Sequence, residues 1–456
     1  MTRPARPAAG MFCSFITRSW FSAPAHALWS DVATLQAWLD VEAALAAAQA
    51  ELGLVPPAAA ATIAARANAL LFDTEALAQE IAHAQHPLVP VLRHFEALCG
   101  EPAAGWLHWG ATTQNIFDTA CALQMRRTHA LVAADLRRAI AALARLAGEH
   151  RDTAVAGRTH GQHALPTTQG FKFAAYVDEL ARDAQRLDER IAPSFPACMG
   201  GAIGTYAAMG GHGRAVEAAL ARRLGLQVSG LPSRASFDRA ADYVSALGLL
   251  AGTAQKIAQD VVFAQRTEVG ELAEAFHDGK IGSSTMAQKR NPSTALLLAS
   301  LARMLRARVP PALEAMVRMD EGDSSATNVT DILLPEVAML GASVAETLVR
   351  LVEGLAVDRE AMQRNLALTG GLISAEALMM RLSPAIGRHE AHRLVYEAAQ
   401  RSQSEGVAFI DCVRQHPGLA PHVEALDLVG ALDPRAYLGE SSALAAGVAQ
   451  RFTPRP

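Results

Sequence analysis

The sequence is poor in aromatic residues and in cysteine. Phe, Trp and Tyr make up 5% of the 456 residues, although hydrophobic residues reach 51%. The apolar content is therefore mostly alanine and leucine, which favours packed helices over sheets. The five cysteines are odd in number, far apart and without a CxxC pair. We therefore expect free thiols in a reducing compartment, and neither a disulfide framework nor a zinc site.

The sequence also lacks a charge excess and a clear targeting or membrane segment. It has 41 basic and 45 acidic residues, a net charge of −4, which argues against nucleic-acid binding. Arg3 and Arg6 are not followed by an apolar run of signal-peptide type. The longest uncharged stretch, 191–213, contains Pro193, Pro196 and a cluster of glycines, which indicates a loop and not a membrane span. We expect a cytoplasmic protein without nucleic-acid or membrane partners.

What the sequence does contain is a series of long helical patterns, and no strand-rich segment stands out. These patterns cover residues 30–54, 115–151, 168–191, 235–276, 292–309 and 332–355. Arginines and acids interrupt each apolar stripe, as in bundle helices. The sequence predicts an all-α fold with an N-terminal helical domain (1–103), a central long-helix bundle (104–355) and a C-terminal helical domain (356–456). Apolar stripes on several faces of long helices further predict a homo-oligomer.

The most informative segment is 282–292, Gly-Ser-Ser-Thr-Met-Ala-Gln-Lys-Arg-Asn-Pro. Pro292 suits the first turn of the helix that follows, and a helix start offers free N–H groups to an anion. Lys289 adds a positive charge and Asn291 a neutral donor. A mobile Ser283 beside them could remove a proton next to a carboxylate. The alternative is a serine-rich helix cap with a surface lysine.

The pattern GSSxMxxKxNP resembles the signature of the fumarase/aspartase superfamily, although Ala287 stands where the family usually has proline. The resemblance implies all-helical homotetrameric lyases, most of which release fumarate. It also implies a central multi-helix core built from four subunits, with each active site at a junction of three. By the same resemblance, Ser284 and Met286 would contact the substrate.

A second segment, 107–115, resembles the family's HxGxTSxD stretch. Thr112, Thr113 and Asn115 would bind a substrate carboxylate from a helix start. Asn115 stands where many relatives have aspartate. The alternative is an ordinary Thr/Asn helix cap.

A third segment, 157–170, resembles the family's RTHxQxAxPxTxG stretch. The resemblance implies that His160 is the general acid toward the leaving group, a task that suits histidine. Thr159 and Gln162 would bind polar groups of the substrate. His160 could equally be a core histidine, and a metal pair with His163 lacks a nearby acidic or cysteine partner.

A further histidine, His86, occupies the place of another catalytic histidine of adenylosuccinate lyases. Pro87 breaks the usual His-Asp pattern there. Because it occupies this place in the chain, His86 is still a candidate for assisting proton transfer.

The chain departs from adenylosuccinate lyases at 321–331, where Gly322 and Asp331 stand in place of arginines. An aspartate would repel a phosphate, which argues against a substrate that carries AMP. The chain also departs from 3-carboxy-cis,cis-muconate cycloisomerases, whose bacterial members commonly have tryptophan at the place of His160.

The sequence therefore predicts a lyase that cleaves the C–N bond of an N-substituted aspartate and releases fumarate. Two alternatives remain: a 3-carboxy-cis,cis-muconate cycloisomerase, and a catalytically silent member kept for structure or binding. In the expected mechanism Ser283 is the base, and Lys289, Asn291 and the helix start stabilise the aci-carboxylate. Closure of the loop 279–287 excludes water. No metal or organic cofactor is needed.

Overall fold

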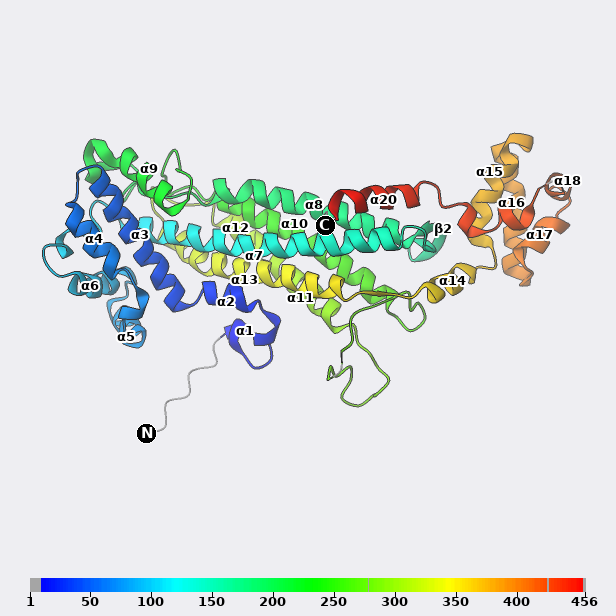
Figure 1. Ribbon diagram of the computed structural model, residues 1–456. Coiled ribbons are helices and arrows are strands. Elements are labelled where there is room, and N and C mark those ends of the chain that lie inside the picture. Colours follow the sequence, from blue (N-terminus) through cyan, green and yellow to red (C-terminus); the bar gives the residue numbers. More distant parts are fainter. Residues whose placement is uncertain (1–9, 278, 425, 454–456) are drawn as a thin grey trace. The chain divides into compact units, whose positions relative to one another are not determined.

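The computed structural model describes residues 10–277, 279–424 and 426–453, and helices make up most of them (Figure 1). This confirms the predicted all-α class. Two short antiparallel pairs of strands are present among the described residues. Strand β1 (Ala154–Thr159) pairs with β2 (Gln162–Thr168), and β3 (Leu272–Ala273) pairs with β4 (Ala356–Val357).

The chain forms two compact units, each built from three separate stretches. Unit 1 comprises residues 1–136, 182–255 and 297–347, and unit 2 comprises residues 137–181, 256–296 and 348–456. Four long helices pass from one unit into the other: α7 (Thr113–Glu149), α8 (Gln169–Ser194), α10 (Asp238–Ala264) and α13 (Ser324–Glu353). Helix α11 (Ser293–Arg306) also crosses the boundary.

Unit 1 also holds shorter helices, most of them near the N-terminus. They are α1 (Gly10–Cys13), η1 (Arg18–Trp20), α2 (Ala23–Leu28), α3 (Asp31–Glu51), α4 (Pro57–Arg66), η2 (Ala69–Leu71), α5 (Thr74–Ala84), α6 (Leu88–Cys99), η3 (Ala104–Trp106), η4 (Ala207–His212), α9 (Gly213–Leu224) and α12 (Val309–Glu314). Buried polar contacts join the long helices within this unit. His129 of α7 contacts the Tyr243 hydroxyl of α10 at 3.1 Å, and Thr253 of α10 donates to Asp183 of α8 at 2.6 Å.

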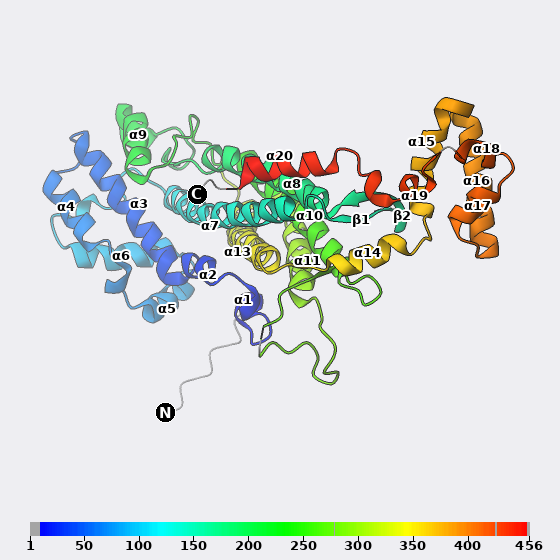
Figure 2. The same cartoon turned by 45° about the vertical axis from the view of Figure 1, so that its right-hand side comes forward.

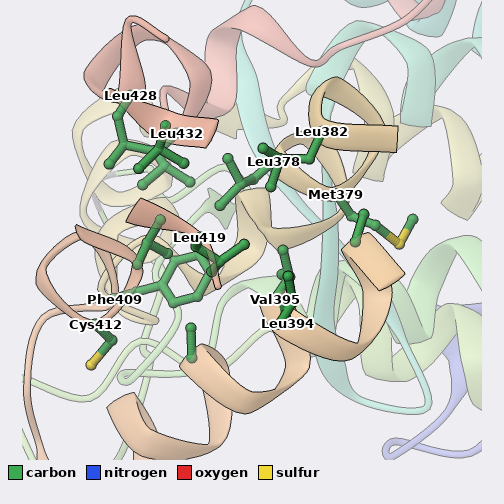
Figure 3. Close-up of a cluster of buried hydrophobic side chains, with 14 residues drawn as sticks. Leu378, Met379, Leu382, Leu394, Val395, Phe409, Cys412, Leu419, Leu428 and Leu432 are labelled. Atoms are coloured by element: carbon green, nitrogen blue, oxygen red, sulfur yellow. The ribbon is translucent and has the colours of Figure 1, made fainter. Parts of the chain in front are cut away.

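Unit 2 ends in a C-terminal group of helices with a core of its own. The elements are α14 (Arg359–Ala367), η5 (Leu372–Ser374), α15 (Ala375–Ile386), α16 (Arg388–Glu405), α17 (Phe409–Gln415), α18 (Ala420–Val423), α19 (Leu428–Ala431), η6 (Pro434–Ala436) and α20 (Ser441–Phe452). Leucines of α15 and α16 meet Phe409 and Cys412 of α17 in this core, and both α17 side chains are fully buried (Figure 3).

Most predicted helices are present with shifted ends, but the prediction for 235–276 is wrong in its second part. Helix α10 ends at Ala264, and the chain turns through Gly270, whose φ is 64°. Leu272 and Ala273 then pair with β4. The long, apolar α13 meets the length and composition of a membrane span, yet 78% of its apolar window is buried inside the structure, as in a core helix.

Candidate functional site

In unit 1, Thr112 and Thr113 lie half-buried where α7 begins. Helix α7 is drawn in cyan in Figure 2. Two buried polar residues of α3 hold the loop that precedes them. Glu42 accepts from the backbone N–H of His108 at 3.2 Å and pairs with its Nδ1 at 2.6 Å. Gln49 donates to the carbonyl of Trp109 at 2.7 Å. The threonines therefore sit on a loop whose backbone is fixed from α3.

Asn115, predicted to contact substrate, is fully buried. Its Oδ1 accepts from the backbone N–H of Thr112 and of Gly201, each at 3.1 Å. Its Nδ2 faces the Sγ of Cys198 at 3.9 Å. In this arrangement the Asn115 amide joins the α7 start to the glycine-rich loop around Gly201, and its contact with substrate stays a prediction.

His86 lies between α5 and α6. Its Nδ1 accepts from the backbone N–H of Val89 at 3.2 Å, in the manner of a helix cap. Because Nδ1 accepts this hydrogen bond, Nε2 is the ring atom left for a proton exchange with the substrate. The participation of His86 in catalysis stays a prediction.

In unit 2, His160 occupies the tip of the β1–β2 hairpin. His160 and Gly161 form its two-residue turn with φ of 53° and 79°, which matches the preference of hairpins for primed turns. Thr159 and Gln162 flank the turn as a cross-strand pair. All four residues are exposed, so the alternative of a buried core histidine is wrong.

A buried ion pair anchors this hairpin. Arg158 of β1 donates to Glu271 through both Nη atoms, at 2.9 Å and 2.6 Å, and Asn365 of α14 donates to the same carboxylate at 2.8 Å. Burial alone would raise the pKa of Glu271. The hydrogen bonds from Arg158 and Asn365 outweigh burial, so its pKa lies below the ordinary value. Such a bidentate pair fixes geometry as well as charge.

A second cation lies beside the hairpin. Lys172 of α8 donates its Nζ to the carbonyl of Ala156 in β1 at 3.0 Å. Burial lowers the pKa of Lys172 to about 8, despite the opposing charge of Glu271. Burial also lowers the pKa of His163. Buried charged and polar groups thus hold the strands of the hairpin, and within the hairpin only the tip, residues 159–162, is exposed.

The signature loop comprises residues 282–292, and contacts between its two ends close its base, which we call the foot. Asn291 donates its Nδ2 to the carbonyl of Gly282 at 2.7 Å. At Gly282, an added Cβ would lie 2.2 Å from the carbonyl oxygen of Lys289, so only glycine allows this approach. Gln265 also holds the foot, because it donates to the carbonyl of Arg290 at 3.2 Å and accepts from the backbone of Glu274 at 2.9 Å.

Ser283 lies half-buried at the start of the exposed part of this loop. Its Oγ accepts from the backbone N–H of Met286 at 3.1 Å and, more weakly, of Thr285 at 3.4 Å. Two donors aimed at one hydroxyl oxygen favour its deprotonated form. Ser284, Met286 and Lys289 are exposed.

The start of α11 does not offer free N–H groups, so that part of the prediction is wrong. The Glu274 carboxylate accepts from the backbone N–H of Thr294 at 3.0 Å and of Ala295 at 3.0 Å. It also pairs with Lys280 at 2.7 Å, and both of these charged side chains are largely buried. A protein carboxylate thus already takes the place that was predicted for the substrate's developing charge.

The predicted residues divide between the two units. His86, Thr112, Thr113 and Asn115 belong to unit 1. Unit 2 holds the hairpin residues Thr159, His160 and Gln162 and the loop residues Ser283, Ser284, Met286, Lys289 and Asn291.

Sequence reasoning missed the groups that position them: Glu42, Gln49, Glu271 and Glu274. For α3 a signal existed, because Glu42 and Gln49 stand seven positions apart on one otherwise apolar face. A polar pair at helical spacing on a buried face indicates partners elsewhere in the fold.

Comparisons with known proteins cover nearly the whole chain. Residues 22–306 match the protein family described as Lyase, and residues 371–448 match the one described as adenylosuccinate lyase C-terminus. N-acetyl-S-(2-succino)cysteine lyase from Dickeya dadantii is 37% identical over 416 residues, which cover 91% of each chain. The 3-carboxy-cis,cis-muconate cycloisomerase of Pseudomonas aeruginosa is 38% identical over 95% of this chain and 96% of its own. The crystal structure of fumarate lyase from Mesorhizobium sp. BNC1 superposes with a TM-score of 0.88 at 34% identity, and covers 94% of this chain and 98% of that chain.

Proposed function

The chain belongs to the fumarase/aspartase superfamily of lyases, and on this premise we propose that it cleaves the C–N bond of an N-substituted aspartate and releases fumarate. In this reaction a base takes the proton from the carbon next to one carboxylate. The C–N bond then breaks, its electron pair leaves on nitrogen, and nitrogen receives a proton. The chemistry needs a base, a stabilised carbanion and an acid.

The proposed base is Ser283. A free serine is a poor base because its alkoxide is costly to form. The backbone N–H groups of Met286 and Thr285 donate to its Oγ, and they would stabilise that alkoxide before the substrate arrives. Lys289 and Asn291 lie on the same loop and would stabilise the aci-carboxylate. Because Glu274 already caps the start of α11, the side chains of Lys289 and Asn291 would stabilise the aci-carboxylate without the helix start.

The proposed acid is His160, and its exposure at the hairpin tip is the observation that carries the choice of reaction. An amine leaves poorly without a proton, so elimination of an amine needs an acid that can reach it. Lactonisation of a carboxymuconate has no leaving heteroatom to protonate. Thr112, Thr113 and Thr159 are proposed to bind the second carboxylate of the substrate, with Gln162, Ser284 and Met286 around it.

The names of two relatives suggest two other reactions, which are the alternatives to C–N cleavage. The Dickeya relative is named for a sulfur-linked succinate, and the Pseudomonas relative for cycloisomerisation. A thiol has a pKa of about 8.5 and leaves readily as thiolate, so C–S cleavage would depend on His160 far less than C–N cleavage.

We further propose a homotetramer with active sites shared between subunits. Within unit 1, several large apolar side chains of the long helices and their connections are exposed: Leu249 (55%), Leu313 (50%), Val317 (79%) and Ile332 (66%). Large apolar side chains that a monomer leaves exposed are candidates for a subunit contact. A second copy of this chain would cover them.

A substrate panel tests the proposal. The wild-type enzyme is incubated with fumarate and a series of amines, and in parallel with N-acetyl-S-(2-succino)cysteine and 3-carboxy-cis,cis-muconate. We expect fumarate to be consumed only with an amine, and the His160→Ala variant to lose about 10²–10⁴-fold in rate. Turnover of the carboxymuconate alone, or of the sulfur compound without dependence on His160, would overturn C–N cleavage.

A further inference from the structure

The glycine-rich loop 199–206 follows α8 in the chain and leads into η4. A hydrogen-bonded contact joins this loop to the start of α7 within unit 1. The Oδ1 atom of Asn115 accepts from the backbone N–H of Gly201 and from that of Thr112, each at 3.1 Å. The place of the loop therefore bears on the backbone of Thr112, which is proposed to bind the second carboxylate of the substrate.

The shape of this loop is fixed by close backbone contacts. The backbone N–H of Tyr206 donates to the carbonyl of Gly200 at 2.8 Å, which joins the two ends of the loop. Gly204 has a φ of 81°, and a Cβ there would lie 2.4 Å from the carbonyl oxygen of Pro232, so only glycine allows this approach. Because Gly201 follows Gly200 directly, a change at either end of the loop shifts the N–H group that Asn115 accepts from.

One carboxylate holds both ends of the loop. Glu217 of α9 is fully buried, with 0% of its surface exposed. Its Oε1 atom accepts from the backbone N–H of Met199 at 3.0 Å, and its Oε2 atom accepts from the hydroxyl of Tyr206 at 2.6 Å. Hydrogen bonds to a buried, charged acceptor are strong and directional. The carboxylate therefore fixes where the loop begins and where it ends.

We propose that Glu217 is a positioning residue for binding of the substrate's second carboxylate, and that it acts through the loop and Asn115 on the backbone of Thr112. The inference rests on the proposed function, because it concerns the same site and the same reaction. Glu217 is buried and does not touch the substrate. Its loss should therefore weaken the binding of fumarate and leave the chemical steps nearly unchanged.

The variant Glu217→Met tests this role, because methionine keeps the length of the side chain and offers no carboxylate oxygen. We expect KM for fumarate, measured in the addition of an amine, to rise about tenfold, with kcat within about threefold of wild type. Glu217→Gln keeps one acceptor oxygen and should lie between the two proteins. Tyr206→Phe removes one of the two donors and should raise KM by a smaller factor. It serves as the second variant if Glu217→Met does not fold.

Ser229→Ala is the matched control. The Ser229 hydroxyl donates to the same Oε1 atom of Glu217 at 3.3 Å, but Ser229 lies outside the loop. This variant should lower the unfolding temperature and keep the wild-type KM. An equal rise of KM in Ser229→Ala and Glu217→Met would show that lost stability alone moves KM, and would overturn the proposal. An unchanged KM in Glu217→Met would do the same.

A double-mutant cycle with Asn115→Ala tests the route from Glu217 to the site. If Glu217 acts through Asn115, Glu217→Met should change KM by less than about twofold once Asn115 is alanine. Effects of the two substitutions that simply multiply would overturn this route.

If no amine is consumed, the proposed function fails, and calorimetric titration with succinate still decides the role of Glu217. Succinate carries the two carboxylates and needs no reaction. Weaker binding in Glu217→Met than in wild type and Ser229→Ala supports the inference. Equal binding in all three proteins, or no binding to wild type, overturns it.

Discussion

Asn291 donates its side-chain amide to the carbonyl of Gly282 at 2.7 Å, and this bond closes the foot of the loop that carries Ser283. The two residues lie at opposite ends of the loop. The foot is further held by the buried pair of Glu274 and Lys280. A closed base below an exposed tip is the arrangement that the predicted closure of this loop requires, and the closure itself stays a prediction.

The closed foot predicts a strong effect of Gly282→Ala. The new Cβ would lie 2.2 Å from the carbonyl oxygen of Lys289, so the two ends of the loop must separate and Ser283 must shift. We expect kcat to fall about 10²-fold or more, with little change in the unfolding temperature. Gly211→Ala is the control, because a Cβ there meets no atom within 4 Å. Equal activity of the two variants would contradict a fixed foot.

The hairpin anchor predicts a stability effect of Arg158→Met. Removal of the guanidinium leaves the buried Glu271 with the Asn365 amide as a hydrogen-bond donor and Lys172 as a nearby charge. We expect a loss of about 3 kcal/mol in unfolding free energy at pH 7. Because the pKa of Glu271 is lowered in the folded state, the contribution of the pair is present above the ordinary carboxyl pKa of 4.5. It is lost as the pH falls through the lower pKa of the folded state.

Urea unfolding at pH 7 and pH 4 measures this effect. The difference between wild type and Arg158→Met should shrink at the lower pH. The double variant Arg158→Met/Glu271→Gln should regain part of the loss, since no buried charge is left without its partner. A pH-independent difference that the double variant does not reduce would show that only packing is involved.

The Asp118 carboxylate predicts a change of stability with pH that is opposite in sign to that of Glu271. Burial raises the pKa of Asp118 from 3.8 to about 6 in the folded state. Its contribution to stability is therefore full below pH 3.8 and is lost as the pH rises through 6. We expect Asp118→Asn to raise the unfolding temperature by a few degrees at pH 7.5 and by clearly less at pH 4.5. Thermal unfolding of both proteins across this range checks the sign, and equal shifts at both pH values would contradict it.

The exposed apolar side chains predict that Ile332→Glu weakens self-association. Ile332 is 66% exposed on α13, and a glutamate would place a charge in the proposed subunit contact. Light scattering after size exclusion should show a tetramer for wild type and smaller species for the variant, with loss of activity. Val429→Glu, at a residue 64% exposed on α19, is the control outside the long helices. A monomeric, active wild type would refute shared sites.

The long helices could be predicted from the sequence because their apolar residues repeat with the helical period over many turns. The sequence pattern predicts a helix over 115–151, and α7 spans Thr113–Glu149. The end of α10 could not be predicted in the same way. Its last predicted residues form β3, and this strand exists because Leu272 pairs with Val357, which is distant in sequence. Local periodicity carries no information about such a partner.

The candidate site also contains some features that local motifs indicate and others that depend on tertiary contacts. The chemistry-bearing residues Ser283, Lys289 and His160 stand in motifs. The residue types suggest roles for Ser283 and Lys289, and the family resemblance implies the role of His160. The capping of α11 by Glu274 depends on a fold that brings it to Thr294, 20 positions away. The same holds for Arg158 and Glu271, 113 positions apart. Contacts of this kind are made by tertiary packing, and no local pattern indicates them.

The most direct test of the account is the rate of fumarate formation by Ser283→Ala, compared with Gln288→Ala. Both residues lie on the same loop, and Gln288 is exposed and has no assigned role. For Ser283→Ala we predict a loss of about 10³-fold or more in kcat, with the binding of a succinate inhibitor unchanged in calorimetry and Gln288→Ala close to wild type. Activity of Ser283→Ala within about threefold of wild type would contradict the claim that the serine oxygen removes the proton.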